Sequence, residues 1–229
     1  MTSVVLTRSQ FENDAFKKDL SSYNFTFVDL ALIEYENLGL NKAVVAGFNN
    51  IIITSKYAAK ILASRSKDLK PGVQFWVVGE LSADILRTVG LNVEYQACDV
   101  ENLISAIPQE IYVDCLYLSA NEITSDLPCE IQRQIIYNVK YKQQLTDIQI
   151  ELLNKGVDYI LLYSVNAAKT FAKLIIDNDM QLKLQNATVI TISASVAKEV
   201  LPYFKKIVYC EKGKHTKMIE LLTSHAETS

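Results

Sequence analysis

Short apolar runs alternate with longer amphipathic segments along almost the whole chain. The amphipathic segments carry apolar residues three and four positions apart, which is the helical period. Continuous Val, Ile and Leu runs separated by helices are typical of a parallel sheet covered on both faces. The pattern predicts an α/β fold with about ten strands, at 3–7, 25–32, 50–54, 74–79, 92–97, 113–119, 135–143, 159–164, 188–193 and 206–211.

The intervening segments predict the helices and their ends. They lie at 9–23, 55–66, 80–90, 99–108, 121–132 and 146–156, with further helices after the last three strands. Ser9 followed by Glu12 fits a helix N-cap with its reciprocal acidic partner. Thr146 or Asp147 fits another N-cap, and Gly156 fits the position just beyond a helix end.

One stretch of the chain recurs at an offset of 109 residues. "IITSKYAAKILA" (52–63) aligns with "LLYSVNAAKTFA" (161–172), which places Ser55 on Ser164. After it, 77–86 resembles 190–200, and 93–107 resembles 207–222. Three strand–helix units in the same order predict two similar half-proteins.

The repeat also predicts how the domains are divided. The middle copy of the repeat is followed by two further predicted strands, whereas the last copy is followed by none. The two strands that would complete the last copy are therefore the runs at the N-terminus, 3–7 and 25–32. We therefore expect two similar doubly wound, flavodoxin-like parallel-sheet domains. One is discontinuous (1–35 and 143–229) and the other is inserted (38–137). Two crossing segments, 33–40 and 137–145, would join them and leave a cleft able to open and close.

Small hydroxylic residues stand where the predicted strands end. In open α/β sheets ligands bind beyond the carboxyl ends of the strands, where helix N-termini offer unpaired N–H groups and a positive dipole end. Each serine or threonine taken singly is explained as an ordinary N-cap. Together they predict an anion-binding surface of neutral donors, which comprises Thr7-Arg8-Ser9, Thr54-Ser55, Gly79 with Ser82, Ser119 with Asn121, Ser164 with Asn166, and Ser193 with Ser195.

Composition and charge narrow the possible functions. The net charge is −3 and the chain has no block of five or more Lys and Arg, so we expect no nucleic-acid partner. No apolar run reaches the ~18–20 residues that span a bilayer, and the N-terminus carries no signal-peptide pattern. We therefore expect no membrane association and a cytoplasmic location, where the four separated cysteines would be reduced thiols.

Several catalytic classes lack their motifs. The sequence has no GxGxxG, no GxxxxGK[ST] and no GxSxG, which argues against a nucleotide loop and against Ser164 as a hydrolase nucleophile. Only two histidines are present, so we expect neither a histidine-based metal site nor a Ser-His-Asp triad.

The same residues resemble uroporphyrinogen-III synthases over nearly the whole chain. The matching phrases are "VVLTRSQ", "IIITSKYAAKIL", "VVGELSADILRTVG", "LYLSANEITSDL", "IIYNVKYKQ", "YILLYSVNAAKTF" and "ITISASVAKEV". The resemblance implies a monomeric enzyme of tetrapyrrole (haem, sirohaem) biosynthesis that needs no metal or cofactor. Its substrate would be a linear tetrapyrrole polycarboxylate, hydroxymethylbilane, which it would cyclise to uroporphyrinogen III.

The resemblance also implies a mechanism and site residues. Loss of the terminal hydroxyl as water leaves a cation, ring attack gives a spiro intermediate, and reclosure inverts ring D. Holding one folded conformer would matter more than acid–base chemistry. Tyr141, in "VKYKQ", matches the family's tyrosine at the end of the crossing strand and would assist loss of the hydroxyl. The same matching gives substrate contacts at Thr54, Ser55, Ser82, Ser164 and Ser195, with Arg8 a further candidate.

The chain departs from the family pattern at two strand ends. Ala120 and Thr124 stand where relatives commonly have Gly and Arg, and Ser193-Ala194-Ser195-Val196 stands where they often have Gly-Pro-Thr-Thr. Two alternatives therefore remain beside the synthase: a non-catalytic two-domain protein that binds a small anionic ligand, and a relative of the synthase that has lost activity. All three share one fold, so the fold alone does not choose between them.

Overall fold

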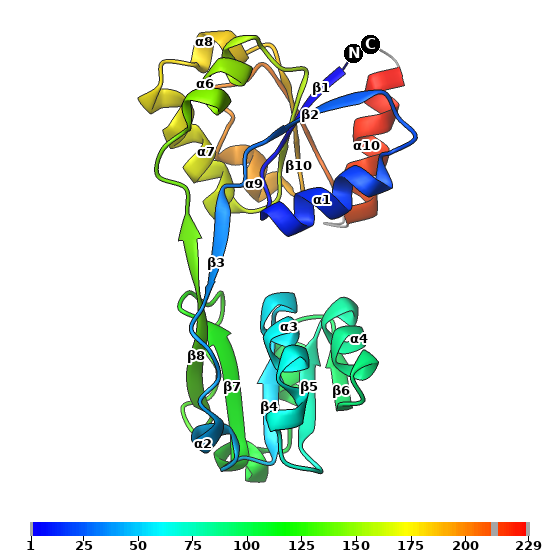
Figure 1. Ribbon diagram of the computed structural model, residues 1–229, viewed down its shortest axis with the longest axis vertical. Helices are drawn as coiled ribbons and strands as arrows, with labels where there is room; N and C mark the ends of the chain where they lie inside the picture. Colours follow the sequence, from blue (N-terminus) through cyan, green and yellow to red (C-terminus); the bar gives the residue numbers. More distant parts are fainter. Residues whose placement is uncertain (1, 212–214, 228–229) are drawn as a thin grey trace. The chain divides into compact units, whose positions relative to one another are not determined.

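The computed structural model describes residues 2–211 and 215–227. The chain folds into two compact units. Unit 1 comprises Met1–Glu34 and Lys140–Ser229, and unit 2 comprises Tyr35–Val139. The chain passes from one unit to the other in two strands, β3 and β8, which Figure 1 shows beside each other.

Unit 1 is built on a five-stranded parallel sheet in the order β11-β10-β9-β1-β2. If the five strands are numbered 1 to 5 along the chain and the sheet is read from β2, the order is the 2-1-3-4-5 of flavodoxin-like sheets. The two N-terminal strands thus complete a sheet whose other three strands come from the last third of the chain. The elements of unit 1 are β1 (Thr2–Leu6), α1 (Gln10–Asp19), β2 (Phe25–Asp29), α6 (Asp147–Asn154), β9 (Tyr159–Leu162), α7 (Val165–Asp177), α8 (Gln181–Leu184), β10 (Thr188–Thr191), α9 (Ala194–Lys198), β11 (Lys206–Tyr209) and α10 (His215–Glu227).

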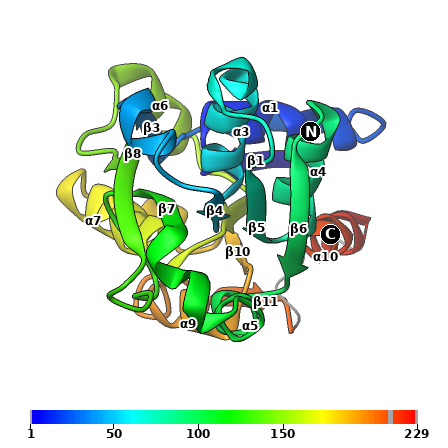
Figure 2. The same cartoon turned by 90° about the horizontal axis from the view of Figure 1, so that it is seen from below.

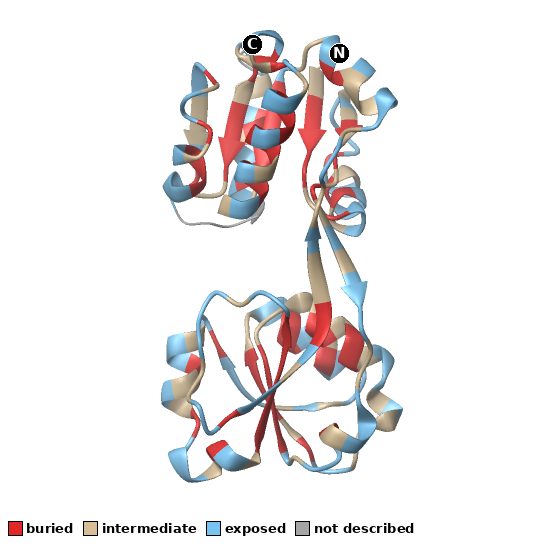
Figure 3. Ribbon diagram, turned by 90° about the vertical axis from the view of Figure 1, so that its left-hand side faces the viewer, coloured by how far each residue is buried: buried red, intermediate tan, exposed pale blue. Residues whose placement is uncertain are grey.

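Both faces of this sheet are covered by helices. Successive residues of a strand point to opposite faces, so each strand contributes side chains to two cores. Ile160 and Leu162 lie in a core with Phe171 of α7, whereas Tyr159 and Leu161 lie in a second core with Phe16 of α1. In Figure 1, α1 and α10 lie on one side of the sheet and α6 to α9 on the other. Figure 3 shows the buried strands between helices whose outer faces are exposed.

Unit 2 repeats the five-strand arrangement of unit 1 with its strands in a different chain order, and adds a sixth strand, β3, at one edge. Its elements are β3 (Ile33–Asn37), α2 (Lys42–Val45), β4 (Asn50–Ile53), α3 (Lys56–Ser64), η1 (Ser66–Asp68), β5 (Gln74–Val78), α4 (Glu80–Thr88), β6 (Asn92–Ala97), α5 (Val100–Ala106), η2 (Gln109–Asp114), β7 (Cys115–Ala120) and β8 (Gln132–Tyr141). The strand order is β3-β8-β7-β4-β5-β6, and Figure 2 shows β7, β4, β5 and β6 in this sequence.

The repeat seen in the sequence corresponds to this shared topology. β4, β5 and β6 take the places of β9, β10 and β11, while β7 and β8 take those of β1 and β2. β4 begins at Asn50 and β9 at Tyr159, which is the offset of 109 residues found in the sequence. Ile51, Ile53 and Phe75 pack beneath α3 and α4, and Ile52 and Trp76 pack on the α5 side, so both faces of this sheet are buried as well.

Three local predictions differ from the structure. The segment 33–37 forms an additional strand, β3, and backbone hydrogen bonds from Leu38 to Ile136 and from Lys142 to Leu32 show that it runs antiparallel to β8. The second sheet is therefore mixed. Residues 121–132 contain no helix, because Pro128 interrupts the helical pattern and Asn121 is held in a turn by its hydrogen bonds to β8.

The third difference concerns helix capping. Ser9 occupies the N-cap position of α1, but its hydroxyl donates to the carboxylate of Glu12 and makes no bond to the helix backbone. A reciprocal capping box is present at α6 instead, between Thr146 and Gln149. Gly156, just beyond α6, has a φ of 79°, as expected for a residue that ends a helix.

We expect Phe171→Ala to lower the free energy of unfolding by about 3–5 kcal/mol, because the ring is fully buried and stacks on Phe204 at a centroid distance of 6.2 Å. Urea denaturation followed by circular dichroism would measure this. Phe11→Ala is the matched control, since Phe11 is 65% exposed and its loss should change stability by less than about 0.5 kcal/mol. Equal effects of the two substitutions would contradict the assignment of the core.

Candidate functional site

The carboxyl ends of the strands are the natural place for a ligand in both units. In open α/β sheets the ligand crevice opens where the strand order reverses direction. In unit 1 this point lies between β1 and β9, where Leu6 pairs with Leu161. In unit 2 it lies between β4 and β7, where Ile53 pairs with Leu118. The residues that follow these strands are therefore the first candidates for a site.

In unit 1 the structure brings Tyr141 to the N-terminus of α7. The side-chain amide of Asn166 donates to Tyr141 Oη at 3.0 Å. Asn166 is the second residue of α7, and Ser164 is its N-cap, whose Oγ accepts from the Ala167 amide at 3.1 Å. Ser164 and Tyr141 are half-buried and Asn166 is exposed. A predicted substrate contact, Ser164, and the predicted catalytic tyrosine, which Asn166 binds, thus lie at the same helix end.

Arg8, also in unit 1, is already engaged within its own unit. It forms an ion pair with Glu12, and its guanidinium carbon lies 4.7 Å from the centre of the Tyr163 ring. Burial raises the pKa of the Tyr163 hydroxyl, and the charge of Arg8 offsets part of that shift. Its neighbour Thr7 is buried and donates to the carbonyl of Leu161. Both residues stabilise the β1–β9 edge, and any contact of Arg8 with a ligand would compete with Glu12.

At the end of β10 the helix cap is Ser193 rather than Ser195. Ser193 Oγ accepts from the Val196 amide at 3.5 Å and lies 2.9 Å from Ser195 Oγ. Ser195 is exposed in the first turn of α9. The two hydroxyls form a pair, so Ser195 can reach a ligand without uncapping the helix.

In unit 2, Ser55 and Thr54 are each hydrogen-bonded to a tyrosine. Ser55 is the N-cap of α3, and its Oγ accepts from the Ala58 amide at 3.1 Å and from Tyr137 Oη at 2.9 Å. Thr54 Oγ1 lies 2.8 Å from Tyr117 Oη. The two tyrosines come from β8 and β7, so three elements meet at this strand end. Sequence reasoning did not find them, because nothing distinguishes them from the chain's other tyrosines.

Ser82 and Gly79 mark the end of β5. Gly79 stands at the N-cap of α4 with a φ of 88°, a conformation that side chains other than glycine rarely adopt. Ser82 lies inside the helix, is 3% exposed, and donates its backbone N–H to the Gly79 carbonyl. Of the predicted contacts in unit 2, Ser82 is therefore the most deeply buried.

An arginine not foreseen from the sequence lies at the turn after β7. Arg133 Nε donates to Ser119 Oγ at 2.7 Å, and Nη2 donates to the carbonyls of Ala120 at 2.7 Å and Asn121 at 3.0 Å. Arg133 lies near the start of β8, and only the pairing of β7 with β8 brings its guanidinium to this turn.

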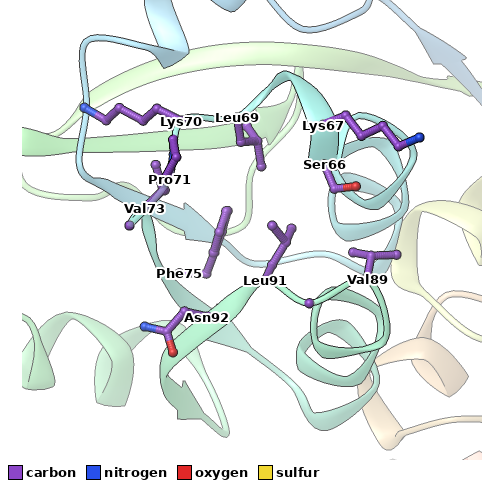
Figure 4. A pocket seen from close by; sticks show the side chains of 12 residues that line it. Ser66, Lys67, Leu69, Lys70, Pro71, Val73, Phe75, Val89, Leu91 and Asn92 are labelled. Carbon is purple, nitrogen blue, oxygen red and sulfur yellow. The ribbon is translucent and has the colours of Figure 1, made fainter.

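Unit 2 also contains a pocket of about 380 Å³ that is separate from these residues. It is lined by the segment before β5, including Lys67 and Lys70, and by the turn before β6. Figure 4 shows Phe75 and Leu91 at its apolar centre, with both lysine side chains extending away. The pocket lies where β5 and β6 begin, whereas Thr54 and Ser55 lie where β4 ends. The pocket is therefore at the opposite ends of the parallel strands from these two residues.

Within residues 2–211 and 215–227, no group of three or more His, Cys, Asp and Glu side chains is placed to hold a metal ion. No helix in that part of the chain combines the length and the apolar character needed to cross a membrane.

Comparisons with known proteins agree with this architecture. Two solved structures share the fold: the uroporphyrinogen-III synthetase of Helicobacter pylori, with a TM-score of 0.65 and 21% identity over 98% of this chain and 99% of that chain, and a mutant uroporphyrinogen III synthase of Thermus thermophilus, with a TM-score of 0.56 and 14% identity over the full length of both.

Two sequence comparisons go further than the fold. An uncharacterised protein of Rickettsia prowazekii (strain Madrid E) is 34% identical, over 99% of this chain and 100% of its own length. The sequence model described as uroporphyrinogen-III synthase HemD matches residues 14–220. Since that match covers far more than half of the chain, the chain belongs to the uroporphyrinogen-III synthase HemD family.

Proposed function

We propose that the chain is an active uroporphyrinogen-III synthase, a cofactor-independent hydro-lyase. It would cyclise hydroxymethylbilane to uroporphyrinogen III with loss of water and inversion of ring D. The observation that carries the proposal is the cluster of Tyr141, Asn166 and Ser164 at the N-terminus of α7. It combines a phenol able to give a proton with a helix end suited to a carboxylate.

The proposed step at Tyr141 begins with the leaving hydroxyl of the substrate. Tyr141 Oη gives its proton to that hydroxyl, the C–O bond breaks, water departs, and the pyrrole nitrogen electrons stabilise the resulting cation. The amide of Asn166, which donates to Oη, stabilises the negative charge that develops there. The ring D carbon that carries the bridge attacks this cation and gives the spiro intermediate. The bond from that carbon to its original bridging carbon then breaks, which leaves a second cation there, and the other α-carbon of ring D attacks it and closes the macrocycle with ring D inverted. The proton that this α-carbon loses as ring D recovers its aromaticity returns to Tyr141, so atoms and charge balance.

The strand ends of each unit supply donors for the carboxylate arms of the substrate. In unit 1 these are Ser164, Ser195 and the first amides of α7. In unit 2 they are Thr54, Ser55 and the first amides of α3, with Ser82 a more buried candidate. Donors fixed by capping and packing lose little freedom when they bind, which favours holding one folded conformer of a reactive substrate. Arg8 remains a candidate contact in competition with Glu12.

The proposed activity predicts that the purified chain turns hydroxymethylbilane, generated in situ, into the type III isomer faster than the spontaneous reaction gives type I. Separation of the two isomers by chromatography would measure this. Only type I product at the background rate would exclude the synthase. Ligand-induced compaction in X-ray scattering without turnover would then favour the binding-protein alternative. The absence of both turnover and compaction would favour an inactive relative.

Tyr141→Phe should lower kcat by about 10²-fold, the low end of the range for general acid catalysis, since the substrate already ionises readily. KM should change little, because the ring remains. Asn166→Ala should lower kcat by about 3- to 10-fold, the worth of one hydrogen bond to Oη. Tyr112→Phe, whose hydroxyl bonds the Ile104 carbonyl in unit 2, is the matched control. Full turnover by a folded Tyr141→Phe protein would remove the acid role.

Aspartate at the serine caps should separate helix capping from substrate binding. Ser164→Asp and Ser55→Asp keep a good N-cap, so thermal stability should stay within a few degrees of wild type. Each would raise KM by about 10-fold or more, because an acceptor-only carboxylate replaces a donor and repels the anionic substrate. Asn41→Asp is the control: it also introduces an aspartate at a helix N-cap, that of α2, and α2 precedes β4 rather than following it. An unchanged KM in both serine variants would contradict the proposed contacts.

A further inference from the structure

The hydroxyl of Ser55 has both of its acceptor positions occupied. A serine oxygen can accept two hydrogen bonds and donate one. Ser55 Oγ accepts from the Ala58 backbone N–H at 3.1 Å and from Tyr137 Oη at 2.9 Å. The remaining capacity of this hydroxyl is its own proton, so a group that binds to it must be an acceptor.

Packing holds Tyr137 in the orientation in which its hydroxyl donates to Ser55 Oγ. The residue is 5% exposed on β8. Its ring meets that of Tyr57 edge-on, with centroids 4.9 Å apart, and that of Tyr35 edge-on at 5.8 Å. Tyr57 is fixed in turn by stacking on Tyr35 at 4.5 Å. Burial raises the pKa of the Tyr137 hydroxyl, although its bond to Ser55 opposes this, so the group keeps its proton and remains a donor at neutral pH.

The equivalent strand end of unit 1 is arranged differently. Ser164 Oγ accepts from the Ala167 amide as Ser55 does from Ala58. The tyrosine hydroxyl near it, that of Tyr141, is an acceptor from Asn166 rather than a donor to the serine. The tyrosine–serine bond is thus a property of unit 2 and does not follow from the fold that the two units share.

We propose that Tyr137 is a positioning residue for substrate binding, which fixes Ser55 as a donor to a carboxylate arm of the linear tetrapyrrole. This inference rests on the proposed synthase function. Without the bond from Tyr137, the Ser55 hydroxyl could rotate and present a lone pair instead of a proton. With the bond in place, Tyr137 selects for anionic groups at this strand end and against cationic ones, without touching the substrate itself.

The test is a double-mutant cycle with hydroxymethylbilane generated in situ. Tyr137→Phe deletes the hydroxyl and keeps the ring contacts. It should raise KM by about 3- to 10-fold, one hydrogen bond's worth, with kcat within about 2-fold of wild type. Tyr112→Phe deletes a hydroxyl of the same unit that is bonded to the Ile104 carbonyl, and should leave KM unchanged. Thermal melting would confirm that each variant is folded.

The cycle distinguishes positioning from general support of the fold. In a Ser55→Ala background, Tyr137→Phe should change KM by less than about 2-fold, since the group on which it acts is gone. Equal effects of Tyr137→Phe in both backgrounds, or a fall in kcat at constant KM, would overturn the inference while the synthase function stands. A wild-type chain that forms no type III product would remove the proposed function and this inference with it.

Discussion

The pairing of β1 with β9 is the constraint on which unit 1 depends. It joins residues more than 150 positions apart, because Val4, Val5 and Leu6 pair with Tyr159, Ile160 and Leu161. At the start of this pairing, the backbone N–H and hydroxyl of Ser3 both donate to the Asp158 carboxylate, at 2.8 and 2.7 Å. At its end, Thr7 donates to Leu161. Bringing such distant segments together costs chain entropy that burial of both sheet faces must offset.

That same pairing decides where the chemistry can be. The strand order reverses at the β1–β9 contact, and α7 starts just beyond it. Ser164 therefore caps its helix at the point where an open sheet admits a ligand. Tyr141 reaches the same helix end because β8 ends at that residue. In unit 2 the β4–β7 pairing has the same consequence for Ser55, which Tyr137 joins from β8.

In the proposed site, the serines at these strand ends both cap helices and bind the substrate. A capping hydroxyl accepts from a backbone N–H and still has a proton to donate, so capping and carboxylate binding do not exclude each other. What differs between the units is the partner of the nearby tyrosine. Tyr141 accepts a hydrogen bond, which suits a group that gives up its proton, whereas Tyr137 donates one to Ser55, which suits a group that orients another.

Much of the fold could be predicted because local patterns of apolar and polar residues determine its strands and helices. Apolar runs such as 50–54 and 159–162 predicted buried parallel strands, and the offset between Ser55 and Ser164 predicted two copies of one topology. β3 was missed because the strand has only five residues and most of them are exposed. A helix was expected at 121–132 because periodicity alone does not register the effect of Pro128.

The sequence by itself determined the α/β class, the repeated strand–helix units and the hydroxyl groups at the strand ends, since each depends on residues close together in the chain. Only the tertiary structure decided which side chains meet there. The bonds of Asn166 to Tyr141, of Tyr137 to Ser55 and of Arg133 to Ser119 span 25, 82 and 14 positions. Such contacts arise from strand pairing and packing, and no local pattern encodes them.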